Sequence, residues 1–398
     1  MASVRHPQSL EGRATRRVSI FGATGSVGSS TLDLMRLDPG GYDVVALTAQ
    51  SRVDELAALA REFQAELAVI GDETLYPALR QALAGTATEA AAGPDALTEA
   101  AARPADWTMA AIVGCAGLAP TMAALKQGRS VALANKEALV SAGALMTDMS
   151  ARSGASLLPV DSEHNAIFQC LMGGNIEDVR KITLTASGGP FRSLSREAMA
   201  SVTPEQAVAH PNWDMGAKIS VDSATMMNKG LELIEAHHLF PVGLDNIEIL
   251  VHPQSVIHSM VEYRDRSTLA QLGSPDMRIP IASALAWPQR MRTNCTPLDL
   301  ATIGQLSFEA LDDERFPAPA LCRAAIAEGG AKPAILNAAN EIAVAAFLAR
   351  NVRFLDITAI VSMVLDGYSP AAPASIDDVL AIDAEARAKA HAIVERMG

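Results

Sequence analysis

Residues 18–28 are Val-Ser-Ile-Phe-Gly-Ala-Thr-Gly-Ser-Val-Gly, an apolar run that enters a glycine-rich turn. Residues 29–36, which follow, have helical character. Glycines in such a strand-to-helix turn let the backbone approach a pyrophosphate, which then lies at the positive end of the helix. The spacing is G-x-x-G-x-x-G, a variant of the commoner dinucleotide fingerprint, so a tight turn without a ligand is the alternative. We predict that a nucleotide-binding α/β unit begins here.

The strand-then-helix pattern repeats up to residue 160. Short apolar runs alternate with longer stretches rich in Ala and Leu, and the runs lie at 18–21, 44–48, 67–70, 110–113, 130–133 and 156–160. Such alternation predicts a parallel sheet wound with helices. We therefore expect a Rossmann-like domain over residues 16–160.

The end of the second predicted strand bears on the choice of cofactor. Enzymes that prefer NAD usually carry an acid there, which holds the ribose hydroxyls. This chain has Ala49-Gln50-Ser51-Arg52 instead, with no carboxylate and with a guanidinium suited to a bidentate phosphate contact. The sequence therefore favours NADPH, with Gln50 and Arg52 as cofactor-binding candidates, although Arg52 is equally explained as a solvated residue at a helix start.

Composition limits the classes of protein to which the chain can belong. Its 398 residues with 49% hydrophobic content predict two or three domains. The formal net charge of -13 argues against a nucleic-acid-binding surface. The cysteines lie far apart, which fits neither a disulfide framework nor a thiolate zinc site: Cys115, Cys170, Cys295 and Cys322. The separated cysteines favour a reducing cytoplasm. No apolar run approaches the roughly 20 residues that span a bilayer, so we expect no membrane partner.

The two ends of the chain differ in character. Residues 1–15 contain Arg and Ser but no apolar core of signal-peptide type, so we expect a disordered extension, with a vestigial targeting segment as the alternative. Residues 289–320 are Pro-rich and irregular, which is typical of a linker. Residues 321–398 are predicted to form a C-terminal α-helical domain, with apolar positions at helical spacing in 334–350 and an amphipathic segment at 377–397. Its polar residues Asn337, Asn340 and Glu341 are better explained by helix packing than by catalysis.

Ala134-Asn-Lys-Glu137 directly follows the fifth predicted strand. Residues at that point lie at the carboxyl edge of a parallel sheet, where ligands bind in such folds. Asn135 is thus a candidate cofactor contact, and Lys136 a candidate for holding substrate hydroxyls, unless it is an exposed lysine at a strand end. Glu137 is either another cofactor contact or a cap of the next helix.

Asp161 and Glu163 follow the last strand of the predicted sheet. In an extended chain, side chains two residues apart project from the same face, so these carboxylates repel unless a cation lies between them. Hard oxygen ligands without Cys suit Mg²⁺ or Mn²⁺. Glu232, at the start of the predicted helix 231–238, is the candidate third ligand. The alternative is that all three acids form salt bridges or caps, and the neighbouring His164 is more simply a packed histidine than a ligand.

Three patches of small polar and basic residues suit a phosphate monoester. They are Ser187-Gly-Gly189 after the apolar strand 181–186, then Ser223, then Asn228-Lys229. Hydroxyls, backbone amides and an ammonium are the donors that a phosphate requires, although each patch is weak support singly.

A polar segment between these patches carries large side chains. Residues 210–216 are His-Pro-Asn-Trp-Asp-Met-Gly, so Pro and Gly bracket Trp213 and Met215. Such side chains are either anchored in the body of the protein or close over a ligand and keep water from a hydride transfer. We favour a lid.

Eight blocks of sequence resemble the 1-deoxy-D-xylulose 5-phosphate reductoisomerase family, over nearly the whole chain from about Arg17. They are GATGSVG (22–28), ANKEALV (134–140), PVDSEHNAIFQ (159–169), LTASGGPFR (184–192), HPNWDMGAKISVDSATMMNKGLE (210–232), HPQSVIHSMV (252–261), LGSPDMR (272–278) and LNAANEIAV (336–344). Together the blocks are highly specific, whereas any one of them is modest support.

The resemblance implies an NADPH-dependent oxidoreductase of isoprenoid biosynthesis with three domains: a Rossmann-like NADPH-binding domain at 16–160, an α+β catalytic, metal-binding and dimerisation domain at 161–288 with a lid loop at about 205–217, and the C-terminal helical domain. It implies a homodimer. The implied metal ligands are Asp161, Glu163 and Glu232. The implied substrate contacts are Lys136, Ser162, Glu163, Ser187, His210, Trp213, Ser223, Asn228, Lys229 and Glu232. The expected cofactor contacts are Thr24, Gly25, Ser26, Val27, Gln50, Arg52, Asn135, Glu137, Gly216 and Met277.

The implied reaction converts 1-deoxy-D-xylulose 5-phosphate to 2-C-methyl-D-erythritol 4-phosphate, with Lys136 and the three acids as catalytic residues. The sequence departs from the family's pattern at Asp214, where we expect a small hydroxyl residue, and at Ala217, where we expect a longer or basic one. These departures bear on lid kinetics and on contacts to the cofactor phosphate, and not on the chemistry.

Two other classes of protein compete with this interpretation. A semialdehyde-type dehydrogenase shares such a nucleotide loop, but it needs a cysteine nucleophile with an activating histidine, and Cys115 and Cys170 have no obvious partner. A non-catalytic NADP sensor or scaffold has no use for three acids beside a phosphate pocket. Absence of metal dependence would favour the sensor.

Overall fold

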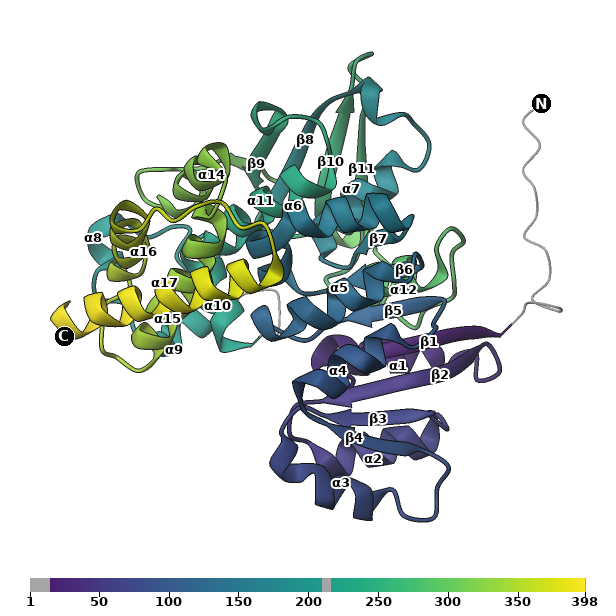
Figure 1. Ribbon diagram of the computed structural model, residues 1–398. Helices are drawn as coiled ribbons and strands as arrows, with labels where there is room; N and C mark the ends of the chain where they lie inside the picture. Colours follow the sequence, from purple (N-terminus) through teal and green to yellow (C-terminus); the bar gives the residue numbers. More distant parts are fainter. Residues whose placement is uncertain (1–14, 210–215, 398) are drawn as a thin grey trace, which may run out of the picture.

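The computed structural model of the protein describes residues 15–209 and 216–397, and its described part is built on two sheets and a group of C-terminal helices (Figure 1). The first sheet has seven parallel strands in the order β4-β3-β2-β1-β5-β6-β7. These strands are β1 (Arg16–Phe21), β2 (Tyr42–Ala49), β3 (Leu67–Ile70), β4 (Glu89–Ala92), β5 (Trp107–Ala110), β6 (Ser130–Leu133) and β7 (Ser156–Pro159). The strand order reverses beside β1, as in doubly wound nucleotide-binding sheets, so the predicted Rossmann-like fold is confirmed.

Helices cover both faces of this sheet because its strands are buried on both sides. In β3, Leu67 and Val69 pack into the core on one face, and Ala68 and Ile70 into the core on the other. The helices of the Leu67 face are α4 (Gly93–Ala102), α5 (Leu118–Lys126) and α6 (Lys136–Ser153). Those of the Ile70 face are α1 (Ser26–Met35), α2 (Val53–Glu62), α3 (Tyr76–Ala82) and α12 (Arg278–Ala286).

Two strand predictions were wrong. The predicted strand 110–113 lies earlier, as β5 (Trp107–Ala110), since Trp107 and Met109 are fully buried whereas Val113 is 75% exposed beyond the edge of the sheet. The sequence analysis missed β4, which consists of Glu-Ala-Ala-Ala. These residues favour helices in isolation, and pairing with β3 overrides that preference.

The second sheet has five strands in the order β11-β10-β8-β9-β12, of which β8 and β9 are parallel and the other pairs antiparallel. Its strands are β8 (Val179–Ala186), β9 (Ile247–Val251), β10 (Ile257–Tyr263), β11 (Thr268–Leu272) and β12 (Glu309–Ala310). The helices of this region are α7 (Ser162–Leu171), α8 (Arg196–Met199), α9 (Pro204–Val208), α10 (Ala217–Ala224) and α11 (Met227–Leu239). Helix α7 packs on β10 and β11.

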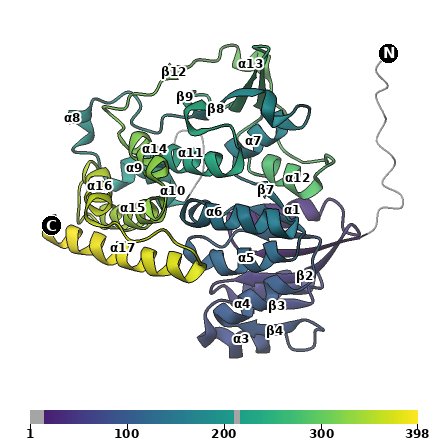
Figure 2. The ribbon, with the colours of Figure 1, turned by 45° about the horizontal axis from the view of Figure 1, so that its top comes forward.

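Residues 289–320 are largely irregular but are not purely a connection. They contain α13 (Leu300–Ile303), and β12 within them extends the second sheet beside β9. The C-terminal helices are α14 (Ala318–Glu328), α15 (Lys332–Leu348), α16 (Asp356–Gly367) and α17 (Ile376–Met397). The long α17, yellow in Figure 2, packs on α15 and touches α6 of the first sheet region. Within the described ranges, no helix is long and apolar enough to cross a membrane.

Helix α12 returns the chain from the second sheet to the first. Trp107 Nε1 on β5 donates to the carbonyl oxygen of Ala284 on α12 at 3.0 Å. Ile281 and Leu285 of α12 are fully buried in the core beneath β1 and β5. Met277, the residue before α12, is thereby held beside the nucleotide-binding sheet.

Candidate active site

The glycine-rich turn after β1 needs two of its glycines for close backbone approach. Gly22 has a φ of +88°, and a Cβ built there would lie 2.6 Å from the carbonyl oxygen of Ala111. A Cβ at Gly28 would lie 2.2 Å from the carbonyl oxygen of Gly22. Gly25 is the N-cap of α1 without a side-chain cap, and Gly25 and Ser26 are exposed. The N–H groups of the first turn of α1 are therefore available to an anion.

The structure brings Arg52 to this turn. Arg52 is the N-cap of α2, and its Nη1 donates to the carbonyl oxygen of Thr24 at 2.8 Å. The side chain is 65% exposed and also pairs with Glu55 at 3.3 Å. Gln50, at the end of β2, is exposed at the same edge. A guanidinium beside the turn fits a cofactor that carries an additional phosphate.

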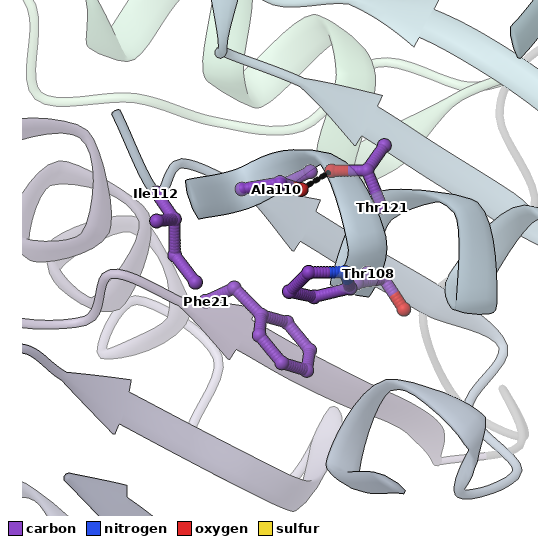
Figure 3. A pocket seen from close by; sticks show the side chains of 7 residues that line it. Phe21, Thr108, Ala110, Ile112 and Thr121 are labelled. Carbon is purple, nitrogen blue, oxygen red and sulfur yellow. Dashed lines mark hydrogen bonds between the residues drawn. The ribbon is translucent and has the colours of Figure 1, made fainter. Parts of the chain in front are cut away.

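A small pocket lies behind the turn, between the ends of β1 and β5 and the start of α5 (Figure 3). It has no interior room for a water molecule and is lined by Phe21, Thr108, Ala110, Ile112, Gly117, Pro120 and Thr121. Thr121 Oγ1 donates to the carbonyl oxygen of Gly117 at 2.6 Å across one side of it. A pocket of this size cannot enclose a dinucleotide, so the open edge above it is the candidate cofactor surface.

Asn135, and not Glu137, caps α6. Its Oδ1 accepts from the Ala138 N–H at 3.0 Å, and its Nδ2 donates to the carbonyl oxygen of Gly114 at 2.9 Å. The amide is 1% exposed, so this predicted cofactor contact is engaged within the protein. The cap makes Lys136 the first residue of α6 and directs the helix from the carboxyl edge of the sheet.

The expectation that Asp161 and Glu163 lie in extended chain was wrong, although their carboxylates do meet. β7 ends at Pro159, and Asp161 is the N-cap of α7, with Oδ1 accepting from the Glu163 N–H at 3.1 Å. Helix geometry and the positive end of α7, instead of strand alternation, bring the two acids together. Glu232 of α11 completes a group whose ligand oxygens all lie within 4.8 Å of one another.

Two lysine ammonium groups lie among these carboxylates. Lys136 Nζ lies 3.2 Å from Oδ2 of Asp161 and 3.0 Å from Oε1 of Glu232. Lys229 Nζ lies 2.9 Å from Oε1 of Glu163 and also pairs with Oε2 of Glu232. Each ammonium therefore bridges two of the three acids, and both reach the acid of α11.

Asn228 and Ser162 add polar contacts to this cluster. Asn228 Oδ1 accepts from Lys136 Nζ at 2.7 Å, and its Nδ2 donates to Glu232. Ser162 Oγ donates to Oε2 of Glu163 at 2.5 Å. Asn228 and Lys229, which the sequence analysis assigned to a phosphate, thus contact the carboxylate cluster in this structure.

Mutual interaction shifts the pKa values of the cluster. Burial alone would raise the pKa of Asp161, but Lys136 and His164 outweigh it and hold that pKa well below its usual range. Burial raises the pKa of Glu232, and the nearby charge of Asp161 adds to the effect. Burial opposes protonation of Lys136, yet the surrounding carboxylates keep its pKa well above the ordinary value. Lys136 is therefore a cation at neutral pH.

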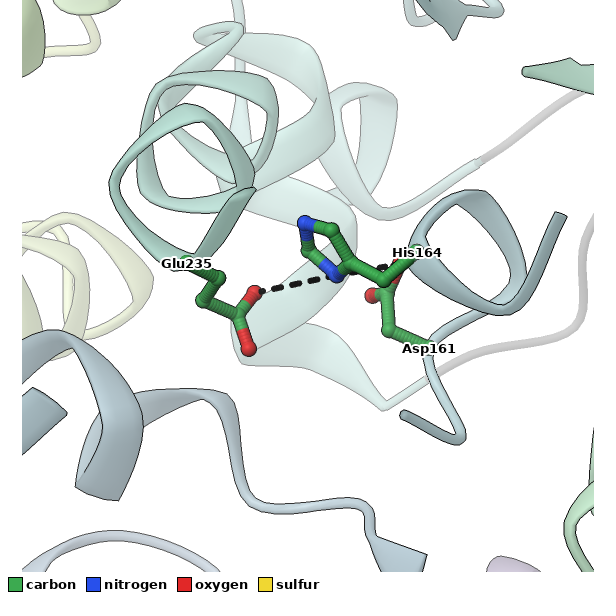
Figure 4. Close-up of side chains that lie close together, drawn as sticks. All are labelled: Asp161, His164 and Glu235. Atoms are coloured by element: carbon green, nitrogen blue, oxygen red, sulfur yellow. Dashed lines mark ion pairs between the residues drawn. The ribbon is translucent and has the colours of Figure 1, made fainter. Parts of the chain in front are cut away.

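Sequence reasoning missed Glu235, which lies three residues after Glu232 on the same face of α11. Figure 4 shows it beside His164 and Asp161. Its Oε2 lies 3.8 Å from Nδ1 of His164, and that nitrogen lies 3.3 Å from Oδ1 of Asp161. His164 Nε2 donates to the carbonyl oxygen of Glu232 at 2.9 Å. Burial would lower the pKa of His164, but Glu235 and Asp161 raise it to about 9. The i, i+3 spacing in the sequence was the signal that could have revealed Glu235.

The residues present fit a divalent cation. Four acids (Asp161, Glu163, Glu232 and Glu235) gather against three basic groups (Lys136, Lys229 and His164), and burial raises the pKa of Glu235 to about 7. Oε2 of Glu232 is buried and pairs with the ammonium of Lys229. Asp161 and Glu163 remain 22% and 19% exposed, which leaves the cluster open to solvent on one side. Clustered carboxylate oxygens are the donors that Mg²⁺ or Mn²⁺ prefers.

The structure also joins two of the predicted phosphate patches. Gly189 has a φ of +66°, and a Cβ there would lie 2.6 Å from the carbonyl oxygen of Ser223. Ser187 Oγ accepts from the Gly189 N–H at 3.1 Å within the same turn. Ser187 and Ser223 are therefore held on neighbouring segments.

The predicted lid lies largely outside the described residues. His210, Trp213 and Met215 belong to the segment that is not described, as does Asp214. Gly216 is the exposed N-cap of α10, and Ala217 is the first residue of that helix.

The cysteines do not support a thiol nucleophile. Burial raises the pKa of Cys115 to about 12, and Cys115 Sγ donates to Asp383 at 3.4 Å. Burial likewise raises the pKa of Cys170 to about 11. Both side chains stay protonated at neutral pH, and a protonated thiol is a poor nucleophile.

His258→Gln is expected to make stability less sensitive to acid. Burial lowers the pKa of His258 to about 4, below the ordinary 6.5, so the unfolded chain binds the proton more readily. The stability that this neutral imidazole contributes is complete above about pH 6.5 and is lost as the pH falls towards 4. Between pH 7 and 5, the wild-type free energy of unfolding should fall by about 2 kcal/mol more than that of the variant.

Urea unfolding at both pH values measures this difference, and an equal fall in the two proteins would contradict it. His391→Gln, at an exposed histidine, is the control.

Family models and relatives agree on one family. The model described as 1-deoxy-D-xylulose 5-phosphate reductoisomerase matches residues 18–143, and the one described as the C-terminal domain of that enzyme matches residues 157–240. A DXP reductoisomerase C-terminal domain model matches residues 272–389. The reductoisomerase of Zymomonas mobilis is 61% identical over 382 residues, 96% of this chain and 98% of that protein. That of Rhodospirillum centenum is 55% identical over 387 residues, 97% of this chain and 96% of that protein.

Solved structures extend this agreement to the fold. The 1-deoxy-D-xylulose 5-phosphate reductoisomerase from Zymomonas mobilis in complex with NADPH has a TM-score of 0.93 and 60% identity, and covers 96% of this chain and 100% of its own. A DOX-P reductoisomerase in complex with NADPH, fosmidomycin and magnesium has a TM-score of 0.90 and 44% identity, and covers 96% of this chain and 98% of its own. The chain therefore belongs to the 1-deoxy-D-xylulose 5-phosphate reductoisomerase family.

Proposed function

We infer that the chain catalyses the NADPH-dependent and divalent-metal-dependent conversion of 1-deoxy-D-xylulose 5-phosphate to 2-C-methyl-D-erythritol 4-phosphate, in the methylerythritol phosphate route to isoprenoids. The observation that carries this inference is the group of Asp161, Glu163 and Glu232, bridged by Lys136 and Lys229, at the edge of a nucleotide-binding sheet. Relatives of the same family whose structures contain NADPH and magnesium support it.

In this proposal, Asp161, Glu163 and Glu232 hold a divalent metal ion. When bound, such an ion supplies a Lewis acid and a template for two neighbouring oxygens of the ketose. Lys136, whose ammonium lies 3.2 Å from Asp161 and 3.0 Å from Glu232, holds the substrate hydroxyls beside it. Ser162 and Asn228, which contact the same side chains, complete the binding surface.

The proposed substrate is rearranged by carbon-carbon cleavage and re-addition to 2-C-methylerythrose 4-phosphate, and the aldehyde is then reduced by hydride. Ser187, Ser223 and Lys229 bind the phosphate, together with His210. The turn at residues 24–27, Gln50 and Arg52 bind the cofactor, with Asn135, Glu137, Gly216 and Met277 around it. Trp213 covers the substrate. Binding of a phosphate remote from the reacting carbons supplies energy that can raise turnover as well as affinity.

Oxidation of NADPH with 1-deoxy-D-xylulose 5-phosphate tests this function. We expect oxidation that requires Mg²⁺ or Mn²⁺, disappears after chelation and returns when the ion is restored. The dephosphorylated sugar should lose turnover as well as affinity, and a compound that joins a phosphonate to a bidentate hydroxamate should inhibit. No oxidation by folded protein with either ion would overturn the proposal and favour an NADP sensor.

Arg52→Ala is expected to reduce the preference for NADPH over NADH. Arg52 is exposed and lies against the turn at Thr24, where its guanidinium can pair with the additional phosphate of NADPH. Loss of a charge-assisted contact of about 1.5–3 kcal/mol should lower kcat/KM for NADPH about tenfold or more. Efficiency with NADH should hardly change. The ratio of the two efficiencies is the measurement, and Arg80→Ala, at an exposed arginine of α3, is the control. If the ratio of kcat/KM for NADPH to that for NADH were unchanged in Arg52→Ala, Arg52 would not bind the additional phosphate of NADPH.

We further propose a homodimer in the cytoplasm. β11 is an edge strand of the second sheet, its residues Thr268, Leu269 and Ala270 are exposed, and Leu269 is 48% exposed. An apolar side chain on an unpaired strand edge supports pairing with a second copy. Sedimentation equilibrium tests the dimer, with Leu269→Lys expected to weaken it.

The proposed domain division follows the two sheets. The nucleotide-binding domain comprises residues 16–160, the catalytic and dimerisation domain residues 161–288, and the helical domain residues 321–398. The packing of α15 and α17 on α6, together with that of α14 on α11, supports a C-terminal domain that contacts both of the others.

A further inference from the structure

A half-buried ammonium outside the carboxylate cluster, 30% exposed, begins a line of polar contacts between three helices. Lys218, the second residue of α10, places Nζ 2.8 Å from Oε1 of Glu137 on α6 and 2.9 Å from Oδ2 of Asp222 on α10. Oδ1 of Asp222 in turn accepts from Asn340 Nδ2 on α15 at 2.8 Å. These four side chains form a continuous line of polar contacts from the edge of the parallel sheet to the C-terminal helices.

Each acid that Lys218 holds is the immediate neighbour of a proposed substrate contact. Glu137 follows Lys136 in the first turn of α6, and Asp222 precedes Ser223 in α10. A shift of either acid therefore moves the adjoining backbone and the substrate-binding side chain with it.

We propose that Lys218 is a positioning residue, which fixes the start of α6 with Lys136 relative to the part of α10 that carries Ser223. The proposal rests on the proposed function, because Lys136 and Ser223 are substrate contacts there. Lys218 itself is not required to touch the substrate.

Burial makes these interactions strong. Glu137 is 8% exposed, Asp222 1% and Asn340 0%, so solvent screens their charges and dipoles weakly. Burial would raise the pKa of Glu137, but Lys218 outweighs it and lowers that pKa, so the carboxylate stays ionised. Removing the ammonium leaves two buried carboxylates facing each other, and their repulsion would separate α6 from α10.

The test compares Lys218→Met with Lys218→Arg, using steady-state oxidation of NADPH with 1-deoxy-D-xylulose 5-phosphate and Mg²⁺. Methionine keeps the length of the side chain and removes the charge, whereas arginine restores the charge. Lys389→Met is the matched control, because Lys389 forms a surface pair with Glu385 on α17. Thermal unfolding and circular dichroism give the folded fraction of each variant.

We expect Lys218→Met to lower kcat/KM for the sugar phosphate about 10- to 100-fold, which is the cost of small misplacements of binding groups. KM should rise and kcat should fall, and arginine should recover most of the loss. If folded Lys218→Met had the kcat and KM of the wild type, Lys218 would have a purely structural role, even if the melting temperature fell. That result would overturn the proposal.

Asn340→Ala keeps the proposal testable if Lys218→Met does not fold. It removes the hydrogen bond to Asp222 but retains the ammonium, and we expect a smaller loss in kcat/KM of about 3- to 10-fold. Unchanged kinetics in folded Asn340→Ala would count against the positioning role. Lack of oxidation by the wild type would instead overturn the proposed function, so the two failures are distinguishable.

Discussion

Replacing Glu232 by Gln is expected to lower kcat/KM for 1-deoxy-D-xylulose 5-phosphate by about 10²- to 10³-fold, the scale seen when one preorganised charged contact is lost. Glu232 is 1% exposed, and both Lys136 and Lys229 pair with it. The neutral amide would leave these buried ammonium groups undercompensated and remove a proposed ligand of the metal ion. NADPH oxidation and Mn²⁺ binding, followed by electron paramagnetic resonance, should both weaken.

Glu248→Gln is the matched control for this change. Glu248 is 55% exposed on β9, pairs with Lys181 at 2.8 Å and has no proposed role in the site. NADPH oxidation and Mn²⁺ binding should therefore stay at wild-type values. If Glu232→Gln bound Mn²⁺ as tightly as the wild type but turned over more slowly, Glu232 would not be a metal ligand. It would still act near the substrate. Unchanged turnover would refute the proposed site.

Gly28→Ala is expected to abolish most NADPH binding and to destabilise the first domain. The new Cβ would lie 2.2 Å from the carbonyl oxygen of Gly22 and 2.6 Å from Cα of Ala23, both backbone atoms that cannot rotate away. We expect a loss of about 1–3 kcal/mol in the free energy of unfolding, as for other overpacked sites. NADPH affinity should fall at least about tenfold, which equals about 1.4 kcal/mol. NADPH fluorescence and urea unfolding measure the two effects.

Gly40→Ala separates this effect from the general cost of replacing a glycine. Gly40 lies in an exposed turn, and a Cβ added there would meet open space, with nothing beyond its chain neighbours within 4 Å. Its variant should match the wild type in NADPH affinity and differ little in stability. If Gly28→Ala binds NADPH as the wild type does, the turn after β1 is not the phosphate-binding element.

Local patterns predicted β1, β2, β3, β6, β7 and β8 and two long helices of the C-terminal region. The apolar spacing of 334–350 and 377–397 corresponds closely to α15 (Lys332–Leu348) and α17 (Ile376–Met397), because a helix with a buried face must repeat its apolar residues about every 3.6 positions. β4 escaped prediction because its alanines acquire a strand conformation only from their neighbour β3. Apolar periodicity therefore predicts a helix that buries one face, but it does not predict a strand whose conformation depends on pairing with its neighbour.

The candidate site was predictable in part. Asp161, Glu163, Glu232 and Lys136 were identified as residue types at strand ends and helix starts, and the structure places them around one point. The reasoning for Asp161 and Glu163 was nevertheless wrong, since a helix cap and not an extended strand brings them together. Glu232 does not begin a helix as predicted, because α11 starts at Met227 and places it in the second turn. The ammonium groups of Lys136 and Lys229 compensate the gathered acids.

By itself, the sequence determined the glycine-rich turn, the alternation of strands and helices in the first domain, the acidic and lysine residue types of the site and the family. Only the tertiary structure decided that Lys229 contacts Glu163, that Glu235 faces His164, and that Lys218 links Glu137 to Asp222. Secondary structure and turn chemistry depend on residues a few positions apart. Contacts between α6, α7, α10 and α11 depend on how the whole chain packs its cores, which no short stretch of sequence specifies.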